Sequence, residues 1–296
     1  MTYTNQQGFF GSSKDNSSLF YQKWLPDNRN QDRHVVFIHG GLEHSGRYQH
    51  LIDYFVEDGV SFYALDLRGH GKSREKTKDF GTIDLMTEDV KNFLEYLRTK
   101  HWVEKPIIIG HSLGGLITLN FSLNPDNQNK IAGLYVSAAS LTLKYHPVLW
   151  LKKILAKNIL NYLCPHLKIA VGLNLKYLSH DKNVIKKYKK DPLVFHSLPV
   201  RFAVDVMDKG EEVVRQAQSI EQLPIFLAHG EADGIAYAQG SVDMFHGIKS
   251  DRKKIKIYPD CYHELFNEVK PKREEVLKDL REWAVALWEE NKNKSM

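Results

Sequence analysis

The sequence has little of what marks a secreted, membrane-spanning or metal-binding protein. Its 296 residues include only two cysteines, Cys164 and Cys261, which lie too far apart to form a paired metal-binding motif. No apolar run approaches the roughly 18 residues that a membrane-spanning helix needs, and the N-terminal stretch lacks a basic segment followed by an apolar one. We therefore expect two free thiols in a cytoplasmic protein without a signal peptide or a spanning helix.

The motifs of nucleotide, metal and nucleic-acid binding are also missing. "DLRGHGKS" (66–73) has glycines followed by Lys and Ser, but it lacks the four-residue gap of G-x-x-x-x-G-K-[ST] and is better explained as a structural turn. The chain has no H-E-x-x-H motif and no Cys/His cluster. Its most basic segment is interleaved with aliphatic rather than aromatic residues, which argues against a nucleic-acid site. The sequence therefore predicts no cofactor, no metal and no nucleic-acid partner.

The composition is that of an ordinary globular protein, with 42% hydrophobic and 26% charged residues, but the charge is unevenly distributed. Residues 141–200 contain eleven lysines and two aspartates, with no arginine or glutamate, although the whole chain carries a net charge of only +5. Leu, Ile and Lys recur there at helical spacing in "VLWLKKILAKNILNYLCP", and no clear strand follows until Pro224. We interpret 141–200 as an inserted segment of short amphipathic helices.

Outside that segment, buried-type strands alternate with amphipathic helices. Two aromatic-rich runs near the start predict a β-hairpin. The strands expected after it begin with "HVVFIHG" and lie at 34–40, from 60 into the turn at 66–73, 106–111, 131–138, 224–230 and 253–259. The helices expected between and after them include 82–101, about 114–124, about 238–247 and about 271–291. This order predicts an α/β fold with a mostly parallel, doubly wound sheet of about eight strands.

One short motif suggests nucleophilic chemistry. "GHSLG" (110–114) fits G-x-S-x-G, in which a serine occupies a sharp turn between a strand and a helix with its hydroxyl exposed at the edge of the sheet. Small residues are needed on both sides because the turn brings the two backbones close together. A β-type run precedes the motif and a helix-compatible segment follows it. Ser112 is therefore the candidate nucleophile.

A serine hydroxyl needs a base and a group that orients the base. Asp233 follows the strand "PIFLAHG", and His263 follows the strand "KKIKIYP", so both are expected at the same edge of the sheet as Ser112. Glu231 and Asp260 are weaker candidates for the acid. The oxyanion of an acyl transfer also needs N–H donors; we assign Leu113, at the start of its helix, and Gly41, in "HGGLEHSGRY", with Leu42 as the alternative to Gly41.

These motifs together resemble one branch of a known family. "HGGLEHSGRY", "DLRGHGKS", "GHSLGG", "GEADG" and "YHELFNE", in this order and spacing, resemble the monoacylglycerol lipase and lysophospholipase branch of the α/β-hydrolases, over nearly the whole chain. The resemblance implies an α/β-hydrolase core over 1–140 and 201–296, with 141–200 as a helical cap. It also implies the same triad and oxyanion residues. The sequence departs from the pattern at Leu42 and Phe266, which leaves the alcohol-side preference open.

The resemblance implies hydrolysis of monoacylglycerols or related single-chain esters through an acyl-enzyme. An apolar cap suits this substrate, because each buried methylene contributes about 0.8 kcal/mol. The cap residues expected to contact the acyl chain are Leu143, Trp150, Leu151, Ile154 and Leu155. A lysophospholipase, a broad carboxylesterase and a catalytically inactive binding protein of the same fold remain alternatives. The basic cap further predicts peripheral contact with anionic membranes.

Overall fold

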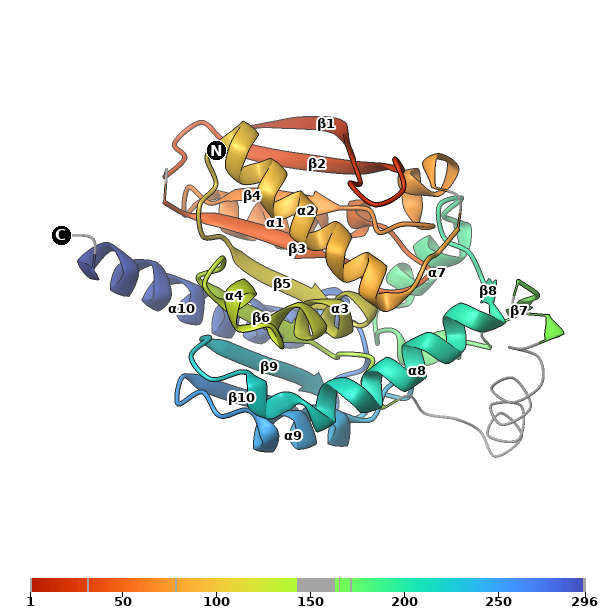
Figure 1. The fold of residues 1–296 in the computed structure, drawn as a ribbon. Coiled ribbons are helices and arrows are strands. Elements are labelled where there is room, and N and C mark those ends of the chain that lie inside the picture. The colour runs from red at the N-terminus through yellow and green to blue at the C-terminus, as the bar shows by residue number, and fades with distance from the viewer. Residues whose placement is uncertain are drawn as a thin grey trace.

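An eight-stranded sheet forms the centre of the molecule, with helices on both faces (Figure 1). The computed structural model describes residues 2–30, 32–77, 79–142, 163–164, 166–170 and 172–294. The order of strands across the sheet is β1-β2-β4-β3-β5-β6-β9-β10. Its members are β1 (Tyr3–Gly11), β2 (Ser18–Pro26), β3 (His34–Ile38), β4 (Ser61–Leu65), β5 (Ile107–His111), β6 (Gly133–Ser137), β9 (Ile225–Gly230) and β10 (Lys253–Tyr258).

The sheet is mostly parallel, which confirms the predicted fold class. Strands β1 and β2 form the expected antiparallel hairpin, and β2 also pairs antiparallel with β4. The remaining neighbours pair in parallel, from β4 through β3, β5, β6 and β9 to β10. The central strands β3 to β6 are buried along their whole length. Their continuous apolar sequences therefore reflect packing on both faces.

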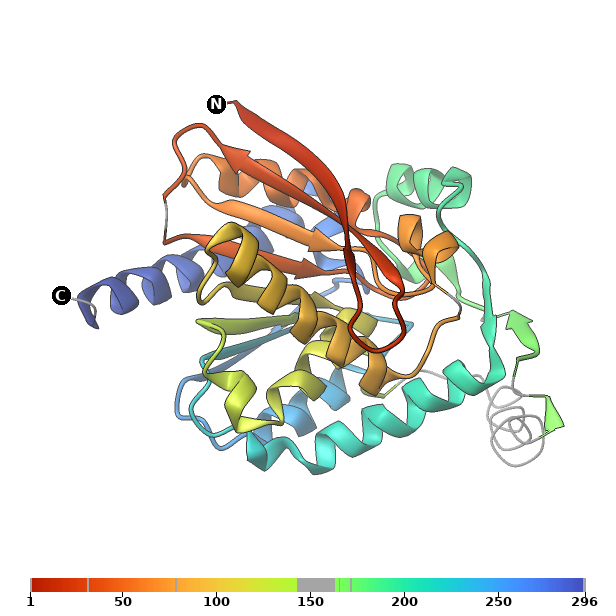
Figure 2. The same ribbon diagram turned by 45° about the horizontal axis from the view of Figure 1, so that its top comes forward.

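Alternate residues of the strands pack into two different cores. Val36 and Ile38 belong to a core with the helices of one face, whereas Val35 and Phe37 belong to a core with those of the other. Figures 1 and 2 show this three-layer arrangement. The first face carries α2 (Ile83–His101), α3 (Leu113–Ser122), α8 (Val200–Arg215) and α9 (Ala238–Gly247); the second carries α1 (Gln49–Val56) and α10 (Lys270–Lys294). A short helix, α4 (Pro125–Gln128), follows α3.

The described part of the predicted cap lies beyond the carboxyl ends of the strands, on the right in Figure 1. It contains α7 (Lys182–Lys190) and two short strands, β7 (Lys168–Ala170) and β8 (Ser197–Pro199), which pair antiparallel. The sequence predicted no strand here, because three-residue strands are too short to leave an alternating pattern. The five predicted acyl-chain residues, at 143–155, lie outside the described residues. The division into core and cap stays a prediction.

The glycine-rich turn at 66–73 is held by buried ion pairs. Arg68 is fully buried, with its Nε 2.8 Å from Asp89 Oδ2 and its Nη1 2.7 Å from Asp15 Oδ2. Asp66 accepts hydrogen bonds from the backbone N–H groups of Ser45 and Lys72. Arg68 and Asp66 of this motif are therefore engaged within the protein, as expected of a structural turn.

Candidate active site

Ser112 occupies a strained turn between β5 and α3. Its backbone has φ 52° and ψ −113°, in the positive-φ region that a non-glycine residue rarely adopts. The neighbouring glycines permit this turn, because a methyl group on Gly114 would overlap the carbonyl oxygens of Ile38 and His39. The Ser112 N–H donates to the Ser137 carbonyl at 2.9 Å, which ties the turn to β6. The turn therefore presents the hydroxyl at the carboxyl edge of the sheet.

The structure brings the three predicted triad residues together. The Ser112 Oγ lies 2.9 Å from His263 Nε2, and the His263 Nδ1 lies 2.7 Å from Asp233 Oδ2. All three side chains are buried. The alternative acids Glu231 and Asp260 are exposed at the surface. The arrangement lets His263 accept the Ser112 proton while Asp233 fixes the orientation of its ring.

Charge and burial act in opposite directions on the imidazole and the carboxylate. Burial lowers the pKa of His263, but the Asp233 charge and hydrogen bond outweigh it, and the pKa is raised above its ordinary value. Burial raises the pKa of Asp233, but the charge of His263 and hydrogen bonds from His229 and His263 outweigh it, and the pKa falls well below its usual range. His111 lies against His263, and burial lowers its pKa to about 3. Asp233 is therefore ionised and His111 neutral near pH 7.

The loop after β3 lies opposite the elbow. The N–H of Gly40 donates to Glu43 Oε1 at 2.6 Å, so it is not free to stabilise an oxyanion. Gly41 and Leu113, the two predicted oxyanion donors, both line the cavity that contains Ser112. Leu42, the alternative, has φ 69°, and its carbonyl accepts from the Phe195 N–H at 3.2 Å. The geometry is compatible with Gly41 and Leu113, whose role stays a prediction.

The cavity beside Ser112 is lined by both apolar and polar side chains. Its volume is about 120 Å³, and it is bordered by residues from the core and from the described part of the cap. Its apolar side chains include Leu173, Leu178, Leu198, Phe202, Val206 and Ile235. Three polar side chains of the lining, Glu43, Glu264 and Tyr188, cluster around Arg47, and we call this cluster the polar end. This lining suits a substrate that carries both an apolar chain and a polar group.

Two carboxylates share one guanidinium at this polar end. Arg47 forms an ion pair with Glu43 and a bidentate pair with Glu264, at 2.7 and 2.9 Å. Its guanidinium also lies 4.7 Å from the centre of the Tyr188 ring. Burial raises the pKa of Glu43, but Arg47, His111 and His39 outweigh it, and the pKa is lowered to about 2. The polar end therefore has one more negative than positive charge.

Among the described residues, the buried hydroxyl of Tyr188 has no hydrogen-bond partner. Tyr188 reaches the cavity from α7 of the predicted cap. A buried hydroxyl without a partner costs free energy, which a polar group of a bound molecule can recover.

Sequence reasoning missed several residues of this site. Glu43 and Arg47 stand in "EHSGRY", where their spacing of four residues indicates an ion pair but not its contact with a distant loop. Ser140, whose Oγ lies 3.1 Å from Ser112 Oγ, follows β6 without any motif. His229 comes directly before the Gly-Glu-Ala-Asp stretch and binds Asp233. Its position at the end of β9 was the only available signal.

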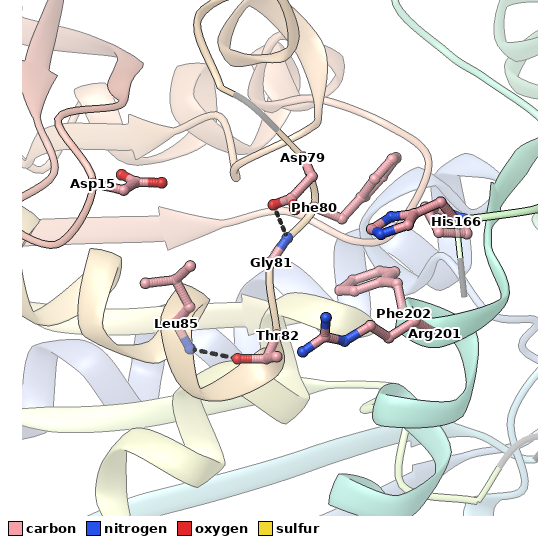
Figure 3. Close-up of a pocket in the computed structure, with 10 residues that line it drawn as sticks. Asp15, Asp79, Phe80, Gly81, Thr82, Leu85, His166, Arg201 and Phe202 are labelled. Atoms are coloured by element: carbon pink, nitrogen blue, oxygen red, sulfur yellow. Dashed lines mark hydrogen bonds between the residues drawn. The ribbon is translucent and has the colours of Figure 1, made fainter. Parts of the chain in front are cut away.

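A larger cavity, of about 310 Å³, is also lined by Phe202 (Figure 3). Phe202 borders both cavities, and its ring lies 5.2 Å from that of Phe80. The polar groups around it, Asp15, Asp79, His166 and Arg201, are distributed over separate loops and a helix end. None of the triad residues lines this cavity, so its size does not make it the reactive site.

Comparison with known proteins identifies relatives over most of the chain. The family model described as "Serine aminopeptidase, S33" matches residues 29–270. A monoacylglycerol lipase of Mycolicibacterium smegmatis is 30% identical, with 90% of this chain and 93% of that protein aligned. A phospholipase of Bacillus subtilis is 27% identical over 83% of this chain and 93% of its own. The crystal structure of a monoacylglycerol lipase from Paleococcus ferrophilus superimposes with a TM-score of 0.78 at 30% identity, covering 97% of this chain and 100% of that one.

Proposed function

Because the chain belongs to the serine aminopeptidase S33 family of α/β-hydrolases, in its monoacylglycerol lipase branch, we propose that it is a serine esterase that hydrolyses monoacylglycerols. The observation that carries this proposal is the continuous hydrogen-bonded series from Ser112 through His263 to Asp233, at 2.9 and 2.7 Å. This series lies in a cavity that is lined by apolar side chains and by the polar end. Fatty acid and glycerol are the products.

The reaction uses these residues in two half-reactions. Ser112 Oγ attacks the ester carbonyl while His263 Nε2 takes its proton, and the N–H groups of Gly41 and Leu113 stabilise the oxyanion. His263 then gives the proton to the leaving glycerol oxygen, which leaves an acyl group on Ser112. A water molecule, deprotonated by His263, then attacks the acyl carbon, and His263 returns the proton to Ser112 Oγ as the fatty acid leaves. Asp233 keeps the imidazole in the required tautomer throughout.

The charge of the polar end supports a neutral alcohol group over a phosphorylated one. Glu43 and Glu264 carry two negative charges against the single positive charge of Arg47. A phosphate brought to the polar end meets two carboxylates whose shared guanidinium, that of Arg47, is already paired with them. A glycerol hydroxyl can instead donate to a carboxylate and accept from the Tyr188 hydroxyl. This argument favours a monoacylglycerol lipase over a lysophospholipase.

An aminopeptidase is the second candidate, because the same carboxylates could pair with a substrate ammonium group. The family description names this activity, and Glu43 and Glu264 supply the acidic groups that it requires. Against it, both carboxylates are already bonded to Arg47, and most of the other side chains that line the cavity are aliphatic or aromatic. We therefore retain ester hydrolysis, rather than peptide hydrolysis, as the proposed reaction.

A substrate panel tests the proposal. The enzyme is assayed with 1- and 2-monoacylglycerols, lysophosphatidylcholine, short p-nitrophenyl esters and aminoacyl p-nitroanilides, alongside the Ser112→Ala variant. We expect hydrolysis of monoacylglycerols with the highest kcat/KM, and a loss of kcat of at least about 10³-fold in Ser112→Ala, because the nucleophile is absent. Faster release of nitroaniline than of fatty acid would favour the aminopeptidase.

Labelling with a fluorophosphonate decides whether the site is reactive at all. The reagent forms a covalent bond to an activated serine, so wild-type protein should be labelled at Ser112 and Ser112→Ala should not. Folded wild-type protein that resists labelling would support the alternative of an inactive binding protein of the same fold.

The peripheral membrane contact predicted from the basic cap is also retained as a proposal. Helix α7 presents Lys182, Lys186, Lys187, Lys189 and Lys190 at the surface, while its Tyr188 faces the cavity. The positively charged surface of α7 would bring the enzyme to anionic lipid interfaces. In the described parts of the chain, we find no helix with the length and apolar character needed to cross a bilayer.

A further inference from the structure

Asp233 receives hydrogen bonds from a second histidine as well as from His263. His229, the next-to-last residue of β9, is fully buried, and its Nε2 lies 3.0 Å from Asp233 Oδ2. This is the same oxygen that lies 2.7 Å from His263 Nδ1. The other carboxylate oxygen, Oδ1, accepts the N–H groups of Ile235 and Ala236, at 2.7 and 3.1 Å. One carboxylate therefore accepts from four donors.

The geometry also fixes which nitrogen of His229 carries a proton. An ionised carboxylate only accepts hydrogen bonds, so the nitrogen that faces Asp233, Nε2, must be protonated in either charge state of the ring. The opposite nitrogen, Nδ1, lies 2.8 Å from Ser241 Oγ, on α9, whose side chain is also buried. In the neutral ring the Ser241 hydroxyl donates to Nδ1 and so stabilises the tautomer that binds Asp233.

We propose that His229 is a positioning residue of the reaction, which holds Asp233 Oδ2 in place through its Nε2–H and moderates the negative charge that this oxygen presents to His263. The proposal rests on the proposed function of the Ser112 site. It extends the hydrogen-bonded series to five side chains: Ser241, His229, Asp233, His263 and Ser112. His229 does not touch the substrate and acts only through Asp233.

This arrangement predicts the direction in which His263 responds to loss of His229. Removing one donor concentrates the charge of Asp233 Oδ2 on the remaining imidazole, which stabilises the imidazolium and raises the pKa of His263 further. The other groups that face His263 are Glu264 beside it, Glu43 from the loop after β3, and the neutral His111 of β5. None of them is altered by a change at His229. The acid limb of the kcat/KM profile reports the pKa of the free base, so this limb should move to higher pH.

Two matched variants separate positioning from folding. His229→Gln keeps an N–H donor near the position of Nε2, whereas His229→Asn places its amide toward Ser241 and leaves Asp233 without this donor. With a p-nitrophenyl ester, we expect His229→Asn to lower kcat by about 10- to 100-fold at unchanged KM, as loss of an orienting outer partner typically does. The acid limb of its kcat/KM profile should shift to higher pH by about half a unit to one unit. His229→Gln should keep most of the wild-type kcat, and the acid limb of its kcat/KM profile should stay at the wild-type pH.

The proposal is overturned if both variants lose activity equally with the acid limb unmoved, which is the behaviour of a purely structural residue. It is also overturned if His229→Asn retains the wild-type kcat and limb. The proposed function can fail independently, if the wild-type protein hydrolyses no substrate of the panel. The far-downfield ¹H resonance of the His263 Nδ1–H then serves as the readout: it should move further downfield in His229→Asn and stay in place in His229→Gln, and the opposite pattern rejects the proposal.

Discussion

The bidentate pair between Arg47 and Glu264 joins two loops that lie 217 residues apart in the chain. Glu264 directly follows His263, so the same contact that neutralises Arg47 also ties the base-bearing loop to the loop after β3. Glu264 is further fixed by the side-chain amide of Asn267, at 2.8 Å. Because all of these groups are buried, the field of the extra carboxylate is weakly screened at the cavity. The Glu264 side chain therefore both fixes the loop that carries His263 and contributes a negative charge to the cavity.

Replacement of Glu264 by Gln should change the choice between alcohol groups. The amide can still bond Arg47 but carries no charge, so the polar end becomes neutral and a phosphorylated substrate is less strongly repelled. We expect the ratio of kcat/KM for lysophosphatidate to that for a monoacylglycerol of the same chain to rise by about tenfold, the equivalent of 1.4 kcal/mol. Glu231→Gln, which removes an exposed charge after β9, is the control. If Glu264→Gln lowered kcat/KM equally for lysophosphatidate and for the monoacylglycerol, this explanation of the preference would be contradicted.

At the scale of elements, the site depends on how closely β5 and α3 approach β3. Gly114 is the second residue of α3 and lies against the backbone of the last residue of β3 and the residue that follows it, Ile38 and His39. No side-chain rotation can relieve a clash with backbone oxygens, so the helix must shift if a Cβ is added. A shift of α3 moves both the Ser112 turn and the Leu113 N–H. Gly114 is therefore needed for the geometry at the start of α3, although a glycine lowers the intrinsic tendency of a segment to form a helix.

Gly114→Ala should therefore cost both stability and activity. We expect a loss of about 1–3 kcal/mol in the free energy of unfolding from overpacking, measured by urea denaturation, and a fall in kcat that exceeds the loss of folded protein. Gly11→Ala is the matched control, because a Cβ on Gly11 meets no atom within 4 Å. Wild-type stability and kcat in Gly114→Ala would show that the contact between α3 and β3 is looser than the structure indicates.

The hydrophobic pattern of the sequence predicts those strands and helices whose residues are buried in a regular pattern. The strands β3 to β6 are buried along their whole length, and the helices α2 and α9 begin and end within one residue of the predicted bounds. The position of Asp233 and His263 followed from the rule that loops after parallel strands meet at one edge. The contacts of Arg47 with Glu264, and of His229 with Asp233, could not be predicted in the same way. They arise from tertiary proximity of single residues on different loops, which leaves no period in the sequence.

At the scale of the whole molecule, charge of opposite sign is separated between surface and cavity. The lysines of α7 lie at the surface, whereas Tyr188 of the same helix lines the cavity together with Glu43 and Glu264. Lysines on the surface are solvated and attract anionic interfaces over a Debye length. The buried carboxylates act only on a molecule that has entered. The same helix can therefore favour an anionic lipid surface while the site selects a neutral ester within it.

Vesicle co-sedimentation tests the surface part of this arrangement. Each lysine near an anionic surface contributes about 1 kcal/mol, so a triple Gln variant at Lys186, Lys187 and Lys190 should bind phosphatidylserine vesicles about 100-fold more weakly than wild type at low salt. Its hydrolysis of a soluble p-nitrophenyl ester should be unchanged, because these side chains do not line the cavity. The control with equal loss of charge is a triple Gln variant of α10, at Lys270, Lys278 and Lys292. Equal binding of wild-type protein to neutral and anionic vesicles at low salt would remove the electrostatic contribution of α7, and the enzyme would then meet its substrate without recruitment by lipid charge.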